Sequence, residues 1–255
     1  MITSELITLC VAAFAAGFID AIVGGGGLVQ APAAFITLPQ YPVATLLGTM
    51  KIPSFAGTSI AAWQYTRRVA IQWQLLGAMA LLAGMAAFAG SYTVSQISNR
   101  FMKPVIFFVL IGVAIYTYTR KNFGMTRSIL PRDTQWTRAL LFAILIGFYD
   151  GFIGPGAGSF MVIFFISALG FDFLSAGAHA KYVNLATNLG SILYFGASNH
   201  ILFQFAIPMA VFNCSGAFLG ARLAILRGNG FIRMFFLCVV AATVLRFGYD
   251  IFLKK

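Results

Sequence analysis

Residues Gly17 to Gly27 place an acidic residue and a run of glycines inside a long hydrophobic stretch. The segment reads GFIDAIVGGGG, and apolar sequence precedes it from Leu6 to Ala16 and follows it from Leu28 to Leu38. Each glycine costs roughly 1 kcal/mol relative to alanine in a helix interior, so four in succession favour the end of a helix. At membrane depth, such a break is tolerated only where its backbone is buried in protein or lines a wet cavity. We therefore predict a broken helix with Asp20 beside the break.

A glycine-rich segment with the same features recurs in the second half of the chain. Residues Gly147 to Gly158 read GFYDGFIGPGAG, and the offset between the two segments is 147 − 17 = 130 residues. At this offset Asp20 corresponds to Asp150, and Lys51 corresponds to Lys181. Interrupted hydrophobic segments at corresponding positions of two halves indicate the binding site of a transporter. We predict an internal duplication.

The composition indicates an integral membrane protein. Hydrophobic residues make up 60% of the chain and charged residues 9%, whereas a soluble domain carries about 25% charged residues. The formal net charge of +11 arises mostly from basic residues in short connections, such as Arg67-Arg68. Basic residues placed in this way are topology signals and contact lipid headgroups. We expect a location in the bacterial inner membrane, contacts with membrane lipid and no binding of nucleic acid.

The expected fold class is all-α, a polytopic membrane protein with two homologous halves of about four hydrophobic segments each. A spanning helix needs about 20 mostly apolar residues. By this rule the segments run from about 6–38, 43–65, 73–94, 104–118, 139–169, 175–197, 203–226 and 231–252. We expect a further interruption at Lys51-Ile52-Pro53, because proline removes a backbone donor. The expected domains are a first transmembrane repeat at 1–120, a basic cytoplasmic linker at 121–138 and a second repeat at 139–255.

The relative orientation of the halves has two interpretations. The connection from Arg120 to Arg138 carries five basic residues and is expected in the cytoplasm. With eight simple crossings, the halves would be parallel. If each broken segment adds a crossing or a re-entrant hairpin, the halves are inverted, and Arg67-Arg68 and the matching Ala197-Ser198 face opposite sides. The length of the broken segments favours inversion.

Two lysines inside apolar segments suggest an anion site. A lysine at the centre of a membrane helix costs at least about 2.5–3.5 kcal/mol, so something must offset that cost. In one interpretation Lys51 and Lys181 bind an anion, and free amides at the starts of half-helices add donors. The expected further ligands are side chains and backbone groups of Thr49, Ser54, His179, Asn184, Gly25, Gly26 and Gly156. The alternatives are structural ion pairs with Asp20 and Asp150, direct or crosswise, or lysines that snorkel to an interface.

Asp20 and Asp150 also have two interpretations. A carboxyl group desolvated in the bilayer can hold and exchange a proton during transport. Alternatively, each carboxylate caps its glycine break or neutralises a lysine. The sequence contains no metal-ligand cluster, nucleotide-phosphate loop or nucleophile triad. We therefore expect no enzyme activity, no catalytic residue, no metal and no cofactor.

The chain resembles the sulfite exporter TauE/SafE family, also described as the toluene-sulfonate uptake permease family. The resemblance rests on Gly17 to Gly27 followed by Pro32, on Gly48-Thr49-Met50-Lys51 and on the repeat at Gly147 to Gly158. The second repeat departs from the family pattern at Pro155, Ala157 and Ala178-His179-Ala180-Lys181.

The resemblance implies secondary transport of a small sulfur-containing anion, either sulfite or an organosulfonate such as sulfoacetate. Export is the common assignment in the family, although uptake is also attributed to it. We expect proton-coupled export, and a homodimer is compatible with this role. The alternatives are an uncoupled anion channel or conduit and a transporter of a non-sulfur carboxylate.

Overall fold

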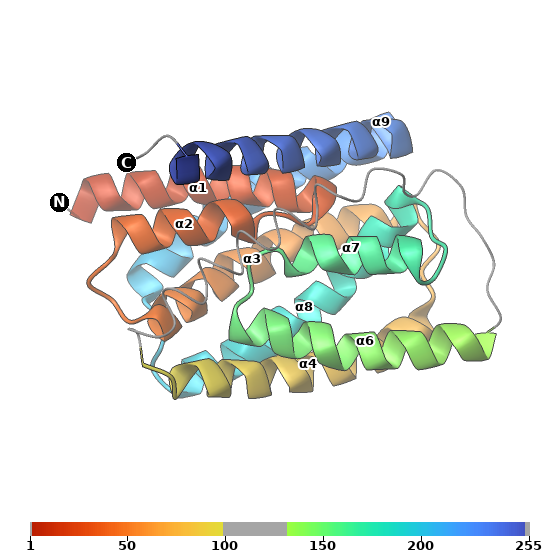
Figure 1. Ribbon diagram of the computed structural model, residues 1–255, viewed down its shortest axis with the longest axis horizontal. Coiled ribbons are helices and arrows are strands. Elements are labelled where there is room, and N and C mark those ends of the chain that lie inside the picture. Colours follow the sequence, from red (N-terminus) through yellow and green to blue (C-terminus); the bar gives the residue numbers. More distant parts are fainter. Residues whose placement is uncertain (1, 99–131, 253–255) are drawn as a thin grey trace.

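The computed structural model describes residues 2–98 and 132–252, and every regular element within them is an α-helix (Figure 1). Side chains are described for residues 4–98, 135–232, 234 and 235. The helices are α1 Ile2–Val23, α2 Gly27–Thr37, α3 Val43–Thr66, α4 Trp73–Ser95, α6 Arg132–Phe152, α7 Ala157–Ser167, α8 Phe173–Ala197 and α9 Phe203–Phe252. The predicted segment at 104–118 and most of the predicted linker lie outside the described residues. The all-α polytopic prediction is confirmed.

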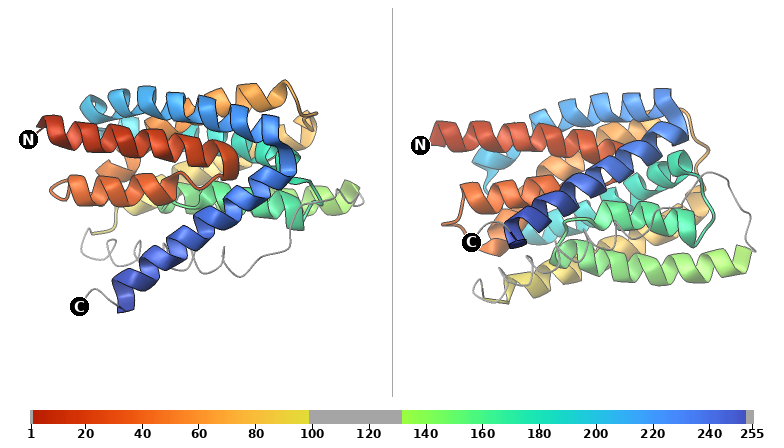
Figure 2. Two further views of the ribbon diagram at one scale, coloured as in Figure 1. Left: turned by 90° about the horizontal axis from the view of Figure 1, so that it is seen from above. Right: turned by 45° about the horizontal axis from the view of Figure 1, so that its top comes forward.

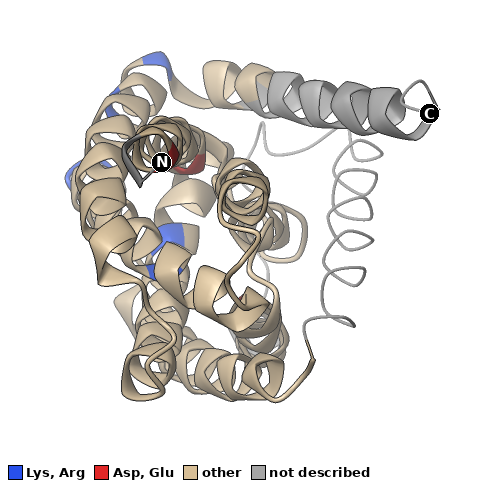
Figure 3. Cartoon of the chain, turned by 90° about the vertical axis from the view of Figure 1, so that its left-hand side faces the viewer, with Lys and Arg blue, Asp and Glu red and all other residues tan. Residues whose placement is uncertain are grey.

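Three of the described helices are long and apolar enough to cross a membrane. These spans are Ser4–Val23, Trp73–Ser95 and Phe203–Ile232, and α2 and α7 are shorter apolar helices. Large apolar side chains are exposed along the spans, among them Val11, Leu81 and Val211. Charged residues are sparse on the helices (Figure 3). Lipid is therefore the solvent that suits this surface.

Both predicted breaks are present, and each separates a long helix from a short one. The first break lies between α1 and α2, and the second between α6 and α7. Gly24 and Gly154 occupy equivalent positions in the two breaks, with φ of +79° and +87°. L-amino acids with side chains rarely adopt this conformation, so glycine is what allows the chain to turn here. Within the first break the chain reverses, and α2 runs back alongside α1 (Figure 1).

The helices of the two halves correspond in position but run in opposite directions. The starts of α2 and α7 differ by 157 − 27 = 130 residues, and those of α3 and α8 by 173 − 43 = 130. In Figure 1, α1 runs away from the N-terminal end of the bundle, whereas α6 begins at the far end and runs towards it. The same reversal holds for α3 and α8. This arrangement has the geometry of an inverted repeat, and the duplication itself stays a prediction.

Packing between helices also follows the correspondence of the halves. Helix α1 packs on α9, α6 packs on α4, and the central helices α3 and α8 contact each other. Gly220 brings α9 against α1, and Gly90 brings α4 against α6. A Cβ at Gly90 would lie 2.3 Å from the Phe148 carbonyl oxygen, and one at Gly220 would lie 2.4 Å from that of Phe18. Small residues thus allow the close helix contact that is typical of membrane bundles.

The buried apolar side chains form two clusters. One contains Leu9 and Met209, from the starts of α1 and α9. The other contains Met79 and Phe165, from the start of α4 and the later part of α7. These positions put the first cluster near the N-terminal end of the bundle and the second near the opposite end (Figure 1). The broken helices meet between the two clusters.

One element differs from the sequence-based expectation, and another agrees with it only when a bend is taken into account. The predicted interruption at Lys51-Ile52-Pro53 is wrong, because α3 continues through Pro53. Proline removes only the donor that would bond to the Thr49 carbonyl, and a helix packed on several neighbours tolerates that loss. The two segments predicted at 203–226 and 231–252 are present as the two helical parts of α9, which meet at a bend where Gly228 has non-helical dihedral angles (φ +69°, ψ −166°). Figure 2 shows that α9 turns back there across the bundle.

Candidate functional site

Lys51 and Asp150 form a buried ion pair between α3 and α6. Lys51 Nζ lies 2.9 Å from Asp150 Oδ1 and 2.7 Å from the main-chain oxygen of the same residue. Both residues are buried, with exposed fractions of 6% and 3%. Lys51 therefore binds the Asp150 carboxylate and also a main-chain carbonyl near the C-terminal end of α6. The helix dipole favours a cation at this end.

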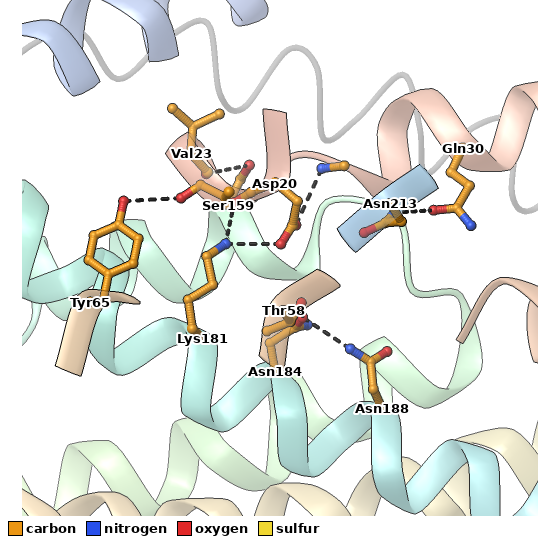
Figure 4. Close-up of polar contacts among 12 residues, drawn as sticks. Asp20, Val23, Gln30, Thr58, Tyr65, Ser159, Lys181, Asn184, Asn188 and Asn213 are labelled. Carbon is orange, nitrogen blue, oxygen red and sulfur yellow. Dashed lines mark hydrogen bonds and ion pairs between the residues drawn. The ribbon is translucent and has the colours of Figure 1, made fainter. Parts of the chain in front are cut away.

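Lys181 and Asp20 form the corresponding pair between α8 and α1. Lys181 Nζ lies 2.9 Å from Asp20 Oδ2 and also donates to the main-chain oxygen of Asp20 (Figure 4). Each lysine thus pairs with the acid of the other half, which is the crosswise alternative. With both pairs charged, the four side chains sum to zero net charge. The lysines are held inside the bundle rather than directed to an interface.

The two acids differ in how their second carboxylate oxygen is used. Asp20 Oδ1 accepts a hydrogen bond from the Gly26 N–H at 3.4 Å, so this side chain also caps the first break. Asp150 Oδ2 is buried and has no hydrogen-bond partner among the residues that the structure describes. The second break follows a different path, since Gly156 has φ of +85° whereas Gly26 has φ of −57°. Two residues that are equivalent in sequence therefore have different environments.

A cavity lies between the two breaks and beside the ion pairs. Its lining comprises Asp20, Gly24, Gly27, Gln30, Ala31, Leu47, Met50, Lys51, Ser54, Asp150, Ile153, Gly154, Pro155, Gly156, Gly158, Asn184 and Asn188. Its volume is ≈ 60 Å³. One water needs about 10–15 Å³ by this measure, so the cavity holds a few waters or one small ion.

The cavity extends from the breaks towards the N-terminal end of the bundle. Gln30 on α2, Leu47 on α3 and Asn188 on α8 line it on that side. Their counterparts 130 residues away, Phe160, Gly177 and Thr58, do not. The cavity therefore extends only towards one end of the bundle, although the helices around it come from corresponding positions in the two halves.

Hydrogen bonds and close backbone contact seal the opposite side of the site. The Tyr65 hydroxyl donates to the Ala21 carbonyl at 3.0 Å, and Ser159 Oγ donates to the Val23 carbonyl at 3.3 Å (Figure 4). A Cβ at Gly24 would lie only 2.4 Å from the Gly158 carbonyl carbon, so the two breaks touch there. These contacts hold α1, α3 and α7 together on this side of the site.

The structure brings together most of the residues predicted from sequence. Of that set, Asp20, Lys51, Ser54, Asp150, Gly156 and Asn184 line the cavity. Lys181 lies behind Asp20 as its ion-pair partner, and Gly26 contributes its N–H to Asp20. Gly25, Thr49 and His179 are not among the lining residues.

Thr49 and His179 are equivalent residues that hold loops in place. Thr49 Oγ1 donates to the Thr45 carbonyl at 2.6 Å and accepts from the Leu202 N–H at 3.0 Å. One ring nitrogen of His179 lies 2.8 Å from the Ser175 carbonyl, and the other accepts from the Gln72 N–H at 3.1 Å. Each side chain therefore links its own helix to the residue just before a helix of the other half, so that Thr49 of α3 holds the start of α9 and His179 of α8 holds the start of α4. The predicted ligand role of both residues finds no support in this geometry.

Gln30 is a cavity residue that the sequence analysis missed. It is 1% exposed, and its Oε1 accepts from Asn213 Nδ2 at 3.4 Å (Figure 4). Its Nε2 is buried, and no residue in the described part of the chain forms a hydrogen bond with it. The available signal was that Gln30 is the single polar residue between Leu28 and Ile36.

The kinds of polar group at the site indicate which ligands suit it. Within the described part of the chain, no group of three or more His, Cys, Asp and Glu side chains could hold a metal ion. Its polar groups are instead two lysines, two acids and neutral amides and hydroxyls, which suit a small charged or hydrogen-bonding ligand.

Comparisons with known proteins identify a family and several transporter relatives. The family model described as "Sulfite exporter TauE/SafE" matches residues 9–247. The chain is 35% identical over 241 residues to the probable membrane transporter protein ORF9 of Sinorhizobium sp, covering 93% of this chain and 90% of that protein. It is 33% identical over 232 residues to a probable membrane transporter protein of Haemophilus influenzae, with 89% and 88% covered. The probable membrane transporter protein YfcA of Escherichia coli K12 is 31% identical over 245 residues, with 93% and 87% covered. No solved structure matches the chain.

Proposed function

Because the chain belongs to the sulfite exporter TauE/SafE family, we propose that it exports a small sulfur-containing anion, sulfite or an organosulfonate such as sulfoacetate, together with a proton. The protein is a membrane transporter, integral to the bacterial inner membrane, as its family and its relatives indicate. The substrate, the direction and the coupling are what the proposal adds. It assigns binding and charge compensation, not catalysis, to the buried lysines and acids.

The observation that carries the proposal is the pair of crosswise Lys–Asp bridges beside one small cavity. Both acids and Lys51 line that cavity, and Lys181 holds Asp20. With both acids ionised the four charges cancel, so an entering monoanion would leave an excess negative charge in a medium of low dielectric constant. If one acid takes up a proton, a lysine is released to the anion and the site becomes neutral again. Anion and proton would then move together.

The half-helices supply a second source of attraction for an anion. Helix α7 starts at Ala157, and the neighbouring Gly156 and Gly158 line the cavity. The N-terminus of a helix carries partial positive charge and amide groups without helical acceptors. Discontinuous helices whose N-termini face an anionic group are found at the binding sites of several transporters. This feature supports an anion over a cation as substrate.

The distribution of arginines supports an orientation in the membrane. Five arginines have described side chains, and they lie just after α3, near the start of α6 and in the part of α9 before its bend, namely Arg67, Arg68, Arg138, Arg222 and Arg227. These segments share the end of the bundle opposite the N-terminus (Figures 1 and 2). Positively charged connections favour the cytoplasmic side. We place this end in the cytoplasm, so the cavity extends towards the other face of the membrane.

Flux measurements on proteoliposomes test the proposal. Vesicles are loaded with sulfite or sulfoacetate, and efflux is followed with and without an acidic interior, using protein-free vesicles as the control. Proton-coupled transport gives saturable efflux that an acidic interior accelerates, with protons leaving alongside the anion. Efflux that ignores the pH gradient and does not saturate indicates an uncoupled conduit. Flux of carboxylates without flux of either sulfur anion would overturn the substrate assignment.

A further inference from the structure

We infer that the cavity binds its anion in a form that carries a hydrogen-bond donor of its own, held between Gln30 Nε2 and Asp150 Oδ2. The inference rests on the proposed function, because it adds the protonation state of the ligand at the same site. Gln30 Nε2 would donate to an oxygen of the ligand, and Asp150 Oδ2 would accept from its O–H. Among small sulfur oxyanions, hydrogensulfite has this chemistry, whereas a simple sulfonate lacks the donor.

The inference starts from buried polar atoms that have no partner in the protein. Within the described residues there are three such side-chain atoms, namely Gln30 Nε2, Asp150 Oδ2 and Ser191 Oγ. Two of the three belong to residues that line the same cavity. Buried polar groups are nearly always hydrogen-bonded, because an unpaired one loses its hydration without compensation. An unpaired donor and an unpaired acceptor at one cavity are what a ligand with both functions would satisfy.

In Gln30 and Asp150 the protein binds one polar atom of the side chain and leaves the other without a partner among the described residues. Asn213 Nδ2 donates to Gln30 Oε1 at 3.4 Å, so the amide nitrogen of Gln30 is the atom left over (Figure 4). Lys51 Nζ lies 2.9 Å from Asp150 Oδ1, so Oδ2 is the oxygen left over. Neither of these two atoms has to give up a hydrogen bond in order to bind a ligand. The other atom of each group is already held in place.

The charges around Asp150 explain why the ligand's proton matters. Lys51 from α3 faces Asp150, Asp20 from α1 lines the same cavity, and Lys181 from α8 pairs with Asp20. On its own helix, the Tyr149 hydroxyl donates to the Pro155 carbonyl at 2.6 Å. Helix α2 and helix α7 contain no titratable residue, and Tyr92 of α4 is exposed. A fully deprotonated oxygen placed against Asp150 Oδ2 would meet a second negative charge, whereas an O–H group would form a hydrogen bond.

The test compares two monoanions of similar shape, hydrogensulfite and methanesulfonate. Methanesulfonate carries the same charge but has no O–H group, because its sulfur bears three unprotonated oxygens and a methyl group. Binding to the purified full-length protein is measured by calorimetry at a mildly acidic pH. We expect hydrogensulfite to bind at least about tenfold more tightly, which corresponds to one good hydrogen bond. If methanesulfonate binds as tightly as hydrogensulfite, the donor–acceptor inference is wrong and the proposed function stands. If the wild-type protein binds neither anion, the proposed function itself fails.

Two variants locate the effect. Gln30→Leu keeps a similar volume without the amide, and it should weaken hydrogensulfite binding about tenfold. Ser191→Ala removes the third unpaired polar atom, which lies outside the cavity lining, and should leave the affinity unchanged. An unchanged affinity in Gln30→Leu, or an equal loss in Ser191→Ala, would exclude Gln30 as a ligand. The wild-type comparison of the two anions needs neither variant to fold.

Discussion

Lys51 on α3 reaches Asp150 on α6, 99 residues further along the chain, with Nζ and Oδ1 2.9 Å apart. Lys181 on α8 reaches Asp20 on α1 in the same way, across 161 residues. Each half of the chain thus supplies the charge that the other half needs. A substitution in one ion pair should therefore weaken the contact between the two halves and also change the charge at the cavity.

Lys51→Ala should destabilise the protein by about 3–5 kcal/mol, because it leaves the Asp150 carboxylate buried without its partner. The double change Lys51→Ala with Asp150→Ala should recover a large part of this loss, since both charges are gone. Unfolding in detergent micelles, followed for the wild type, both single variants and the double variant, gives the coupling energy. Simple additivity of the two single changes would show that the bridge contributes nothing.

Gly24→Ala should be among the most disruptive single-methyl changes in this protein. Its φ of +79° disfavours a side chain, and the new Cβ would lie 2.4 Å from the Gly158 carbonyl carbon. The free energy of unfolding should fall by more than about 2 kcal/mol, because the new side chain strains the backbone at residue 24 and displaces the backbone at Gly158. The matched control is Gly77→Ala in α4, where nothing lies within 4 Å, and this change should stabilise the helix by up to about 1 kcal/mol. Equal thermal stability of the two variants would contradict the packing of the two breaks.

His179→Ala should lower stability without altering anion affinity. The change removes the acceptor for the Gln72 N–H and leaves that donor unpaired, at a cost of about 1–3 kcal/mol. Thr49→Val is the counterpart in the other half, because it removes the acceptor for the Leu202 N–H. Thermal unfolding and sulfite binding are measured on both variants. A tenfold loss of affinity with unchanged stability would restore His179 as a candidate ligand.

Tyr65→Phe should weaken the closed side of the site by removing one hydrogen bond. The Tyr65 hydroxyl is buried and donates to the Ala21 carbonyl at 3.0 Å, so its loss should cost about 1 kcal/mol. Tyr92→Phe is the control, because Tyr92 is 54% exposed. Thermal unfolding and the rate of sulfite efflux are compared for both. We expect both quantities to change in Tyr65→Phe alone, since under the proposed function this contact opens for the substrate to pass.

Asp172→Asn should reveal a charge contribution that depends on pH. Burial disfavours the charged form of Asp172, but hydrogen bonds from the Ser175 N–H and hydroxyl outweigh it, and the pKa of this carboxyl is lowered from its ordinary value of 3.8. A lowered pKa in the folded state means that the stabilisation is complete above pH 3.8 and is lost as the pH falls through the lower, folded value.

Asparagine also caps helices well, so the comparison isolates the charge. The free energy of unfolding of the wild type should exceed that of Asp172→Asn by up to about 1 kcal/mol at neutral pH. This difference should shrink under strongly acidic conditions. Denaturant unfolding at several pH values measures this difference. A difference that grows as the pH falls would contradict the assignment.

Local sequence was sufficient to predict the membrane helices and their breaks. Runs of apolar residues mark the spans, and glycine runs beside Asp20 and Asp150 end helices through backbone propensity alone. The same local reasoning failed at Pro53, because packing on neighbouring helices outweighed one missing hydrogen bond. Local sequence also could not distinguish two roles for His179, namely holding the chain before α4 and binding a ligand. Both roles need a buried polar side chain.

The tertiary structure alone decided which groups meet. Crosswise pairing of Lys51 with Asp150, and of Lys181 with Asp20, depends on the antiparallel placement of the two halves. The cavity and the unpaired amide of Gln30 exist because short half-helices end inside the bundle. Helix propensity and hydrophobicity act over a few residues along the chain, whereas the electrostatics and hydrogen bonding of this site act between residues brought together only by folding.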